Sequence, residues 1–242
     1  MMDKKPKILV FTGAGLSAPS GLQTFRDNNG MWNEFDPNKV ANMRTFKENK
    51  ALIFEFYNKL RTMLGDIQPN KGHYMLAELQ QYYGADRVII CTQNVDDLLE
   101  KAGCRNVIHV HGRLTDMMCL ASRHIWNVGY TDVQIGTACP VCQNTGIKPG
   151  VIFFNEMAPE YVKMASMFHK KMRSVHDVVL CIGTRFEVVS EHRILGDVKS
   201  FNILANMHRD EGIDYKLFSE IFIGDINETA ANIKKLILSK IE

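Results

Sequence analysis

Several features that would point to an unusual environment are missing from this chain of 242 residues. Charge of one sign is not in excess, since 29 Lys and Arg residues face 27 Asp and Glu residues and leave a net charge of +2. That balance gives no reason to expect direct contact with nucleic acid. No apolar run approaches the roughly 18–20 residues that span a bilayer. No small-residue cleavage site follows the short apolar stretch near the N-terminus, so we expect a cytoplasmic protein without a membrane partner.

Internal repeats and low-complexity tracts are also missing, and the composition is that of a folded soluble protein, with 45% apolar and 23% charged residues. The length fits one large domain, or one domain with a smaller insertion. Of the six cysteines, only Cys139 and Cys142 form a close pair. In a reducing compartment such a pair indicates metal or redox chemistry before a disulfide.

Short β-rich apolar runs alternate with helical patterns along the chain. The expected strands are 7–11, 87–91, 106–110 and 177–182, with weaker candidates at 201–204 and 220–223. The expected helices are 50–64, 71–83, 95–101, 157–174 and 229–241. This alternation predicts an α/β fold in which a Rossmann-like parallel sheet carries helices on both faces.

The spacing of these elements is uneven. About 75 residues separate the first two expected strands, far more than one crossover helix needs, and residues 112–150 are rich in turn formers. We interpret both segments as insertions that together form a smaller lobe. The predicted larger lobe comprises residues 1–34, 85–112 and 150–242, and the insertions are a helical one at 35–84 and a second one at 113–149.

A glycine turn follows the first expected strand, with Gly13 and Gly15 two residues apart. Such a turn lets the backbone approach a pyrophosphate, although a simple strand-to-helix turn has the same pattern. A dehydrogenase would then need a second strand ending in an acidic residue about 20 positions on. Residues 20–32, with two glycines and two asparagines, instead predict a loop, which disfavours hydride transfer. Within it, Arg26 suits either a phosphate or a surface ion pair, and Phe25 either shields a reacting ring or packs in the core.

Three motifs in order resemble the signature of the sirtuins, the NAD-dependent protein deacylases. Residues 13–26 read Gly-Ala-Gly-Leu-Ser-Ala-Pro-Ser-Gly-Leu-Gln-Thr-Phe-Arg, followed by Gly30-Met31-Trp32. Residues 92–96 (Thr-Gln-Asn-Val-Asp) are similar to the second motif, and residues 107–112 (Val-Ile-His-Val-His-Gly) to the strand with the catalytic histidine. The resemblance spans nearly the whole chain and is greatest to the bacterial deacylases.

The resemblance implies that the chain removes acyl groups, most often acetyl, from protein lysines and releases nicotinamide and O-acyl-ADP-ribose. NAD is the implied co-substrate. Its implied contacts are Gly13, Ala14, Gly15, Ser17, Ala18, Thr24, Phe25, Arg26, Trp32, Gln93, Asn94, Val95, Asp96, His111, Gly183, Thr184, Arg185 and Asn206. A related NAD hydrolase, a mono-ADP-ribosyltransferase and a non-catalytic NAD-binding module are the alternatives.

Three residues are candidates for catalysis. Asn94 and Asp96 follow a buried strand, so they emerge at the carboxyl end of the sheet, where open α/β sheets bind ligands; a helix cap is the alternative. His111 can take a proton near neutral pH, and we expect it to be the general base. A strand histidine is more often a core group, and His109 with His111 would also suit a metal pair, but no carboxylate cluster accompanies them.

The resemblance implies that an acyl-lysine protein binds as an added strand. The implied substrate contacts are Tyr57, Val151, Phe153, Phe154, Asn155 and Glu156. Tyr57 is similar to the Tyr of a Tyr-x-x-Arg pair that reads acidic acyl chains. Leu60 stands at the position of that Arg, and Arg61 is rotated by about 100° on a helix. We therefore expect acetyl-lysine to be preferred over succinyl-lysine, and we expect a monomeric enzyme.

The family's small lobe usually holds structural zinc with two Cys-x-x-Cys pairs, which would make the second insertion zinc-ribbon-like. Here Cys139 and Cys142 form one pair, whereas the first reads Cys119-Leu-Ala-Ser122. The implied zinc ligands are Cys119, Cys139 and Cys142. Completion by His124 or water, weak binding and no metal remain alternatives. Asn155 and Arg185 also depart from the family pattern, on loops expected to bind the peptide.

Overall fold

The computed structural model describes residues 7–22, 35–161, 164, 177–195 and 199–241. Its larger sheet has six parallel strands in the order β3-β2-β1-β7-β8-β9. These strands are β1 (Ile8–Thr12), β2 (Val88–Thr92), β3 (Ile108–His109), β7 (Val178–Ile182), β8 (Phe201–Asn206) and β9 (Glu220–Ile223). The order reverses between β1 and β7, and the ligand crevice of such folds lies at this kind of switch point.

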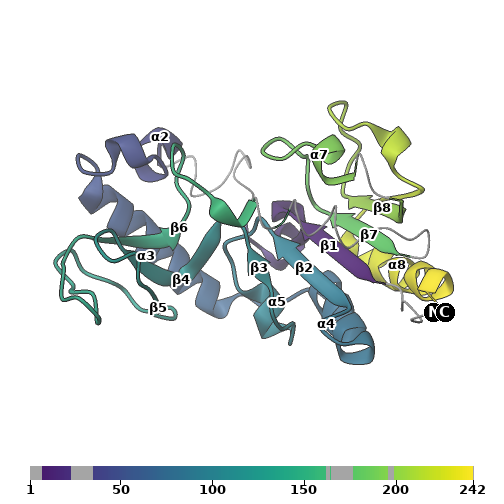
Figure 1. Ribbon diagram of the computed structural model, residues 1–242, viewed down its shortest axis with the longest axis horizontal. Helices are drawn as coiled ribbons and strands as arrows, with labels where there is room; N and C mark the ends of the chain where they lie inside the picture. The colour runs from purple at the N-terminus through teal and green to yellow at the C-terminus, as the bar shows by residue number, and fades with distance from the viewer. Residues whose placement is uncertain (1–6, 23–34, 162–163, 165–176, 196–198, 242) are drawn as a thin grey trace.

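Figure 1 shows the larger sheet at one end of the molecule and a second, smaller sheet at the other. The smaller sheet is antiparallel in the order β5-β4-β6, with β4 (Gly112–Cys119), β5 (Ile125–Asn127) and β6 (Ile147–Val151). The described α-helices are α2 (Pro37–Val40), α3 (Lys50–Asp66), α4 (Lys71–Tyr83), α5 (Leu98–Lys101), α7 (Glu191–Leu195) and α8 (Ile226–Ile241). Short 3₁₀ turns are Ala14–Leu16, Ala18–Ser20, Met43–Thr45 and Tyr215–Leu217.

Alternate residues of β1 enter two hydrophobic clusters, one on each face of the larger sheet. Ile8 and Val10 pack with residues of α4 and α8. Leu9 and Phe11 pack on the opposite face with Phe186, Ile194 and others. All five residues of β1 are buried, as expected for a parallel sheet covered on both sides. The predicted α/β fold with a Rossmann-like sheet is therefore confirmed.

Helix α4 lies in the segment that the predicted boundaries assign to the smaller lobe. Its apolar residues Met75, Leu76 and Leu79 nevertheless belong to the cluster under the larger sheet, together with Ile233 and Ile237 of α8. Helix α3, in contrast, contributes Ile53, Phe56 and Leu64 to a separate cluster around Leu114 and Phe153. We therefore propose that the helical insertion ends before α4 rather than at residue 84.

The smaller sheet was not expected from the sequence, which showed little periodicity over residues 112–150. The reason lies in β4, where six consecutive residues are buried, including the polar Thr115 and Asp116. Asp116 accepts hydrogen bonds from Asn127 at 2.9 Å and from Arg113 at 2.9 Å, which satisfies its carboxylate away from water. Buried polar residues thus hide the alternation that would mark this strand.

Most predicted elements of the larger lobe lie within one or two residues of the observed ones, and α4 matches its prediction at both ends. The expected helix 95–101 is shorter because the Asp96 carboxylate accepts from the amide of Leu98, where α5 begins. The expected strand 106–110 shrinks to Ile108–His109, after Asn106 with a φ of 54°. The expected helix 157–174 lies mostly outside the described residues. In the described part of the chain, no helix is long and apolar enough to cross a membrane.

Candidate active site

The glycine turn after β1 is locked against the loop that follows β7. The amide of Gly13 donates to the Ile182 carbonyl and that of Gly15 to the Gly183 carbonyl, both at 2.9 Å. A Cβ atom on Gly13 would lie 2.7 Å from the Gly183 oxygen, so a side chain would separate the two loops. Two 3₁₀ turns follow instead of a long helix, and Ala14 and Ala18 lie in them.

A recess lies beside this turn at the carboxyl ends of the strands, lined by Gly15, Ile182, Gly183, Ala205, Asn206 and Gly224 among others. The Asn206 side chain holds the recess in shape, because Oδ1 accepts from the Thr184 amide at 3.2 Å and Nδ2 donates to its carbonyl at 2.9 Å. Gln93 joins from β2 by donating to the Thr184 hydroxyl at 3.1 Å. Residues from three strands thus converge where nucleotides bind in this fold class.

The remaining candidate NAD contacts are placed differently. The Arg185 side chain is exposed, forms an ion pair with Asp210 and lies 3.8 Å from Glu187. Its guanidinium is therefore held by acidic side chains. The other expected contacts in the loop after the glycine turn lie outside the described residues; these are Thr24, Phe25, Arg26 and Trp32.

A buried histidine that the sequence analysis did not single out orders the polar core of the site. Nδ1 of His73 accepts from the main-chain amide of Asn70 at 3.2 Å, so the ring hydrogen sits on Nε2. Nε2 then donates to the Ser17 hydroxyl at 3.4 Å. Burial lowers the pKa of His73 to about 4, which keeps the ring neutral. The Asn70-x-x-His73 capping box was the available sequence signal.

Ser17 in turn connects His73 to Asn94 and Asp96, the two polar residues predicted after β2. Its oxygen also accepts from Nδ2 of Asn94 at 3.0 Å, and its hydroxyl hydrogen-bonds the Asp96 carboxylate. Burial raises the pKa of Asp96, and the hydrogen bonds from Ser17 and Leu98 oppose that rise. Ser17 therefore lies beside Asn94 and Asp96, and its hydrogen bonds orient both side chains.

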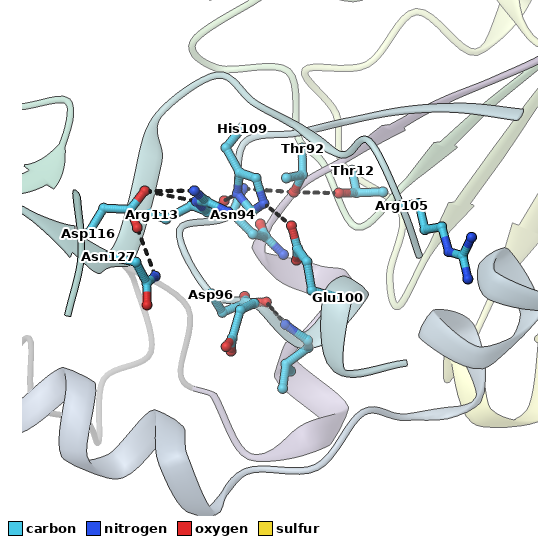
Figure 2. Close-up of polar contacts among 12 residues, drawn as sticks. Thr12, Thr92, Asn94, Asp96, Glu100, Arg105, His109, Arg113, Asp116 and Asn127 are labelled. Atoms are coloured by element: carbon cyan, nitrogen blue, oxygen red, sulfur yellow. Dashed lines mark hydrogen bonds and ion pairs between the residues drawn. The ribbon is translucent and has the colours of Figure 1, made fainter. Parts of the chain in front are cut away.

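The main chain of this loop is fixed as well, as Figure 2 shows. The hydroxyl of Thr92 accepts from the Asn94 amide at 2.9 Å and from the Thr12 hydroxyl at 2.7 Å. Nδ1 of His109 lies 3.0 Å from the Asn94 carbonyl, and its Nε2 lies 2.8 Å from Glu100. Burial disfavours ionisation of Glu100, but the hydrogen bond and charge of His109 outweigh it and lower the pKa. His109 is thus a structural link, not half of a metal pair with His111.

The tautomer of His111 is fixed by its own hydrogen bonds. Nδ1 lies 2.7 Å from the Gln93 carbonyl, which can only accept, so Nδ1 carries the hydrogen and Nε2 carries the lone pair. Burial lowers the pKa of His111, against a smaller opposing effect of the Gln93 bond. The Tyr161 hydroxyl hydrogen-bonds Nε2, a contact that no sequence motif indicated.

The segment Val151–Glu156, which we call the substrate loop, begins beside His111. The Ile152 amide donates to the His111 carbonyl at 2.7 Å, and Phe154 bridges to residues 41–43 of the helical insertion. Asn155, at a position where the family pattern has Gly, has a φ of 64°, which Asn tolerates better than most residues. The Val151 and Phe153 side chains are buried, whereas Phe154 is exposed.

Tyr57 and Arg61, the residues considered for recognition of the acyl group, lie on α3 under the substrate loop. Tyr57 is buried and stacks on Phe153 with 5.6 Å between ring centroids. Burial, and then the charge of Glu156, raise the pKa of Tyr57. Arg61 is completely buried, but it donates to the carbonyls of Leu114 at 3.4 Å and Thr131 at 3.3 Å. The guanidinium of Arg61 is therefore engaged by main-chain carbonyls.

The three expected metal ligands come together at the far end of the smaller sheet. The sulfurs of Cys119, Cys139 and Cys142 all lie within 4.8 Å of one another. Those of Cys119 and Cys142 are 3.6 Å apart, near the edge of about 3.8 Å in a zinc tetrahedron with bonds of about 2.3 Å. His124 Nδ1 and Ser122 Oγ lie 3.6 Å and 3.9 Å from the Cys139 sulfur. Three soft ligands at this spacing fit zinc.

Comparison with known proteins agrees with this geometry. The sequence model of the Sir2 family matches residues 13–190. An NAD-dependent protein deacylase of Helicobacter hepaticus is 41% identical, with 95% of this chain and 96% of that protein covered. A mutant Sir2 homologue bound to ADP-ribose is 27% identical with a TM-score of 0.80, covering 98% of this chain and 93% of its own. A Sir2 homologue bound to NAD is 29% identical with a TM-score of 0.78, covering 99% and 92%.

Proposed function

Because this chain belongs to the Sir2 family of NAD-dependent protein deacylases, we propose that it removes acetyl groups from protein lysines with His111 as the general base. The observation that carries this assignment is the fixed tautomer of His111. Its Nδ1 hydrogen is committed to the Gln93 carbonyl, which leaves Nε2 to accept a proton beside the loop of Asn94 and Asp96.

The residues around the recess suit the co-substrate. NAD, when bound, supplies nicotinamide as leaving group and the ribose that receives the acyl oxygen. The glycine turn and the Thr184–Asn206 pair would hold the phosphates and the adenosine side. Asn94 would hold a ribose hydroxyl or an ordered water, and Asp96 the nicotinamide amide. Because Ser17 already orients both side chains, little freedom remains to be lost on binding.

Proton transfer falls to His111. Its lowered pKa keeps the imidazole neutral at neutral pH, so Nε2 can take the proton of a ribose hydroxyl as that oxygen attacks the acyl carbon. The resulting charge on the ring is stabilised by the Gln93 carbonyl through Nδ1. One water is consumed as the acetyl group leaves the lysine nitrogen, and the expected products are the free lysine, nicotinamide and O-acetyl-ADP-ribose.

The acyl-lysine peptide is proposed to bind as an extended strand along the exposed edge marked by Phe154 and Val188. Apolar groups lie below that edge, since Tyr57, Leu60 and Phe153 belong to one hydrophobic cluster. With Arg61 bound to main-chain carbonyls, this cluster favours an uncharged acetyl group over a succinyl group.

Zinc, held by Cys119, Cys139 and Cys142 with His124 or Ser122 near the fourth position, would act as a structural crosslink. It would tie the end of β4 to the turn at residues 139–142. The ribose and the acyl group would react beside His111, which lies outside this cluster, so the proposed steps use only this chain's own side chains.

One experiment tests the proposal: incubation with NAD and an acetyl-lysine peptide, followed by mass spectrometry of the products. O-acetyl-ADP-ribose together with nicotinamide and free lysine is the expected result. ADP-ribose as the only nucleotide product would indicate a hydrolase, and an ADP-ribosylated protein would indicate a transferase. NAD binding without turnover would indicate a binding module, and each of these three results contradicts the proposal.

A further inference from the structure

The substrate loop rests on a buried cation that the proposed chemistry does not use. Lys148, on β6, is completely buried, which is rare for an ammonium group. Its Nζ donates to the carbonyl of Pro149 at 3.2 Å and to that of Val151, and lies 3.0 Å from Oε2 of Glu156. It also lies 4.3 Å from the centroid of the Phe153 ring. One ammonium therefore contacts the first residue, the last residue and the central ring of the loop.

Glu156 completes the arrangement from the other end of the loop. Its Oε2 also accepts from the main-chain amide of Phe153 at 3.0 Å. Its Oε1 is buried without a hydrogen bond among the described residues and forms an ion pair with Arg123 at 3.8 Å. Arg123 lies in the turn between Cys119 and His124, where its amide donates to the Cys119 carbonyl at 3.0 Å. We call Lys148, Glu156 and Arg123 the Glu156 clamp.

The clamp acts on the edge of the loop opposite to the one that pairs with His111 and Ala41, where the Phe153 carbonyl accepts from the Glu156 amide at 3.1 Å. Successive residues of an extended chain point their amides to opposite sides. The amides of Ile152 and Phe154 bond the carbonyls of His111 and Ala41 on one side. The Phe153 amide points to the other side, where it meets Glu156. Without that carboxylate, the amide and the Val151 carbonyl would be free to pair in another register.

We propose that Glu156 is a positioning residue for the peptide substrate, which the clamp uses to fix the main chain that presents Phe154 and Asn155. This inference rests on the proposed function, since it assigns the loop to the acyl-lysine peptide. A buried ion pair is weak support for stability, but setting register is a use to which such pairs are well suited. The clamp therefore acts on peptide affinity and leaves the NAD site and the base unchanged.

Kinetics of matched variants test the proposal. Glu156→Gln alone leaves the buried ammonium without a counter-charge, so the main variant is Lys148→Met combined with Glu156→Gln, which removes both charges and preserves volume. Arg123→Ala removes only the exposed member of the Glu156 clamp and leaves the buried pair of Lys148 and Glu156 intact. Lys59→Ala is the control, because Lys59 also forms an ion pair, with Glu55 at 3.3 Å on α3, in which both side chains are exposed. The readouts are kcat, KM for an acetyl-lysine peptide, KM for NAD, and peptide affinity by fluorescence anisotropy.

The double variant is expected to raise the peptide KM by about tenfold with kcat and the NAD KM unchanged. Arg123→Ala is expected to raise the peptide KM by about twofold to threefold, because a half-exposed ion pair contributes little free energy. Peptide affinity falls by the same factors, and Lys59→Ala changes none of the four quantities.

A purely structural role would instead lower kcat and both affinities together. That result overturns the proposal, and so does an unchanged peptide KM in both variants. If the double variant does not fold, the peptide KM of Arg123→Ala alone decides whether the proposal holds. A wild-type protein that deacylates nothing refutes the proposed function first, before any variant is compared.

Discussion

The hydroxyl of Tyr161 hydrogen-bonds Nε2 of His111, the nitrogen that the proposed mechanism uses as a base. The other ring nitrogen is bonded to the Gln93 carbonyl, so Tyr161 is the donor in this contact. A ribose hydroxyl and Tyr161 would need the same lone pair. The phenol of Tyr161 therefore covers the acceptor position of the proposed base.

Removing that phenol hydroxyl is predicted to leave the enzyme active. In Tyr161→Phe the lone pair is free, so kcat/KM rises by at most roughly tenfold, since a hydrogen bond contributes about 0.5–1.5 kcal/mol net. The acidic limb of the pH profile moves to higher pH, because a hydrogen bond to Nε2 favours the neutral ring. Steady-state rates across pH give both quantities. His111→Ala is the comparison and should lose deacylation while still binding NAD. Equal losses in the two variants would make Tyr161 a catalytic residue instead.

Acid should destabilise the fold through His73. The pKa of this ring is about 4 in the folded protein and about 6.5 when unfolded. Between these values the unfolded chain binds the extra proton, so the contribution is fully present above pH ~6.5 and lost as pH falls toward ~4. Its size is about 3 kcal/mol over that window.

Urea unfolding of the wild type and His73→Gln at about pH 7 and about pH 5 measures this effect. Comparing the two proteins cancels the other titrating groups, including Asp96, whose raised pKa acts in the opposite direction. The variant should show the smaller loss of stability on acidification. The same loss in both proteins would show that His73 is not buried neutral.

A substitution of Leu60 on α3 is predicted to change which acyl group the enzyme prefers. Leu60 follows Tyr57 by three residues on α3 and packs in the same cluster. Leu60→Arg should raise succinyl-lysine turnover relative to acetyl-lysine by roughly tenfold to a hundredfold, since hydrogen bonds to charged groups contribute about 1.5–3 kcal/mol. Leu60→Met, of similar length and uncharged, is the control and should show no gain. A wild type that turns over succinyl-lysine as fast as acetyl-lysine would refute this account of the pocket.

Zinc should be present at one ion per chain in protein purified without chelator. Cys139→Ala removes one of the three sulfurs and is expected to abolish stoichiometric zinc and to lower Tm by several degrees, because a structural ion contributes directly to folding free energy. Elemental analysis and thermal unfolding are the measurements. Cys104→Ala is the control, since Cys104 lies in the core of the larger lobe. Wild-type protein without zinc would show that Ser122 and His124 do not complete the site.

Ser17, Asn94 and Asp96 share a simple property: each belongs to a short motif that follows a buried strand. Ser17, Asn94 and Asp96 meet because parallel strands deliver their carboxyl ends to one edge of the sheet, and that edge could be predicted from β-rich runs. The three cysteines were predicted in another way, from the resemblance to a family whose small lobe carries two Cys-x-x-Cys pairs.

The residues that were missed depend on partners far along the chain. Ser17 and His73 are 56 positions apart, and His111 and Tyr161 are 50 apart, so no local pattern joins them. The antiparallel sheet was missed for another reason. Its central strand buries Thr115 and Asp116, whose polarity is compensated by hydrogen bonds that only the folded structure reveals.

If NAD is consumed in order to move an acyl group from lysine, the amounts of two products are tied to one another. Nicotinamide release and peptide deacetylation are measured in the same reaction, with and without the acetyl-lysine peptide. We expect one nicotinamide released for each lysine deacetylated, and little nicotinamide when the peptide is left out. Nicotinamide released at the same rate without the acyl-lysine would contradict the account, because NAD cleavage would then be independent of acyl transfer.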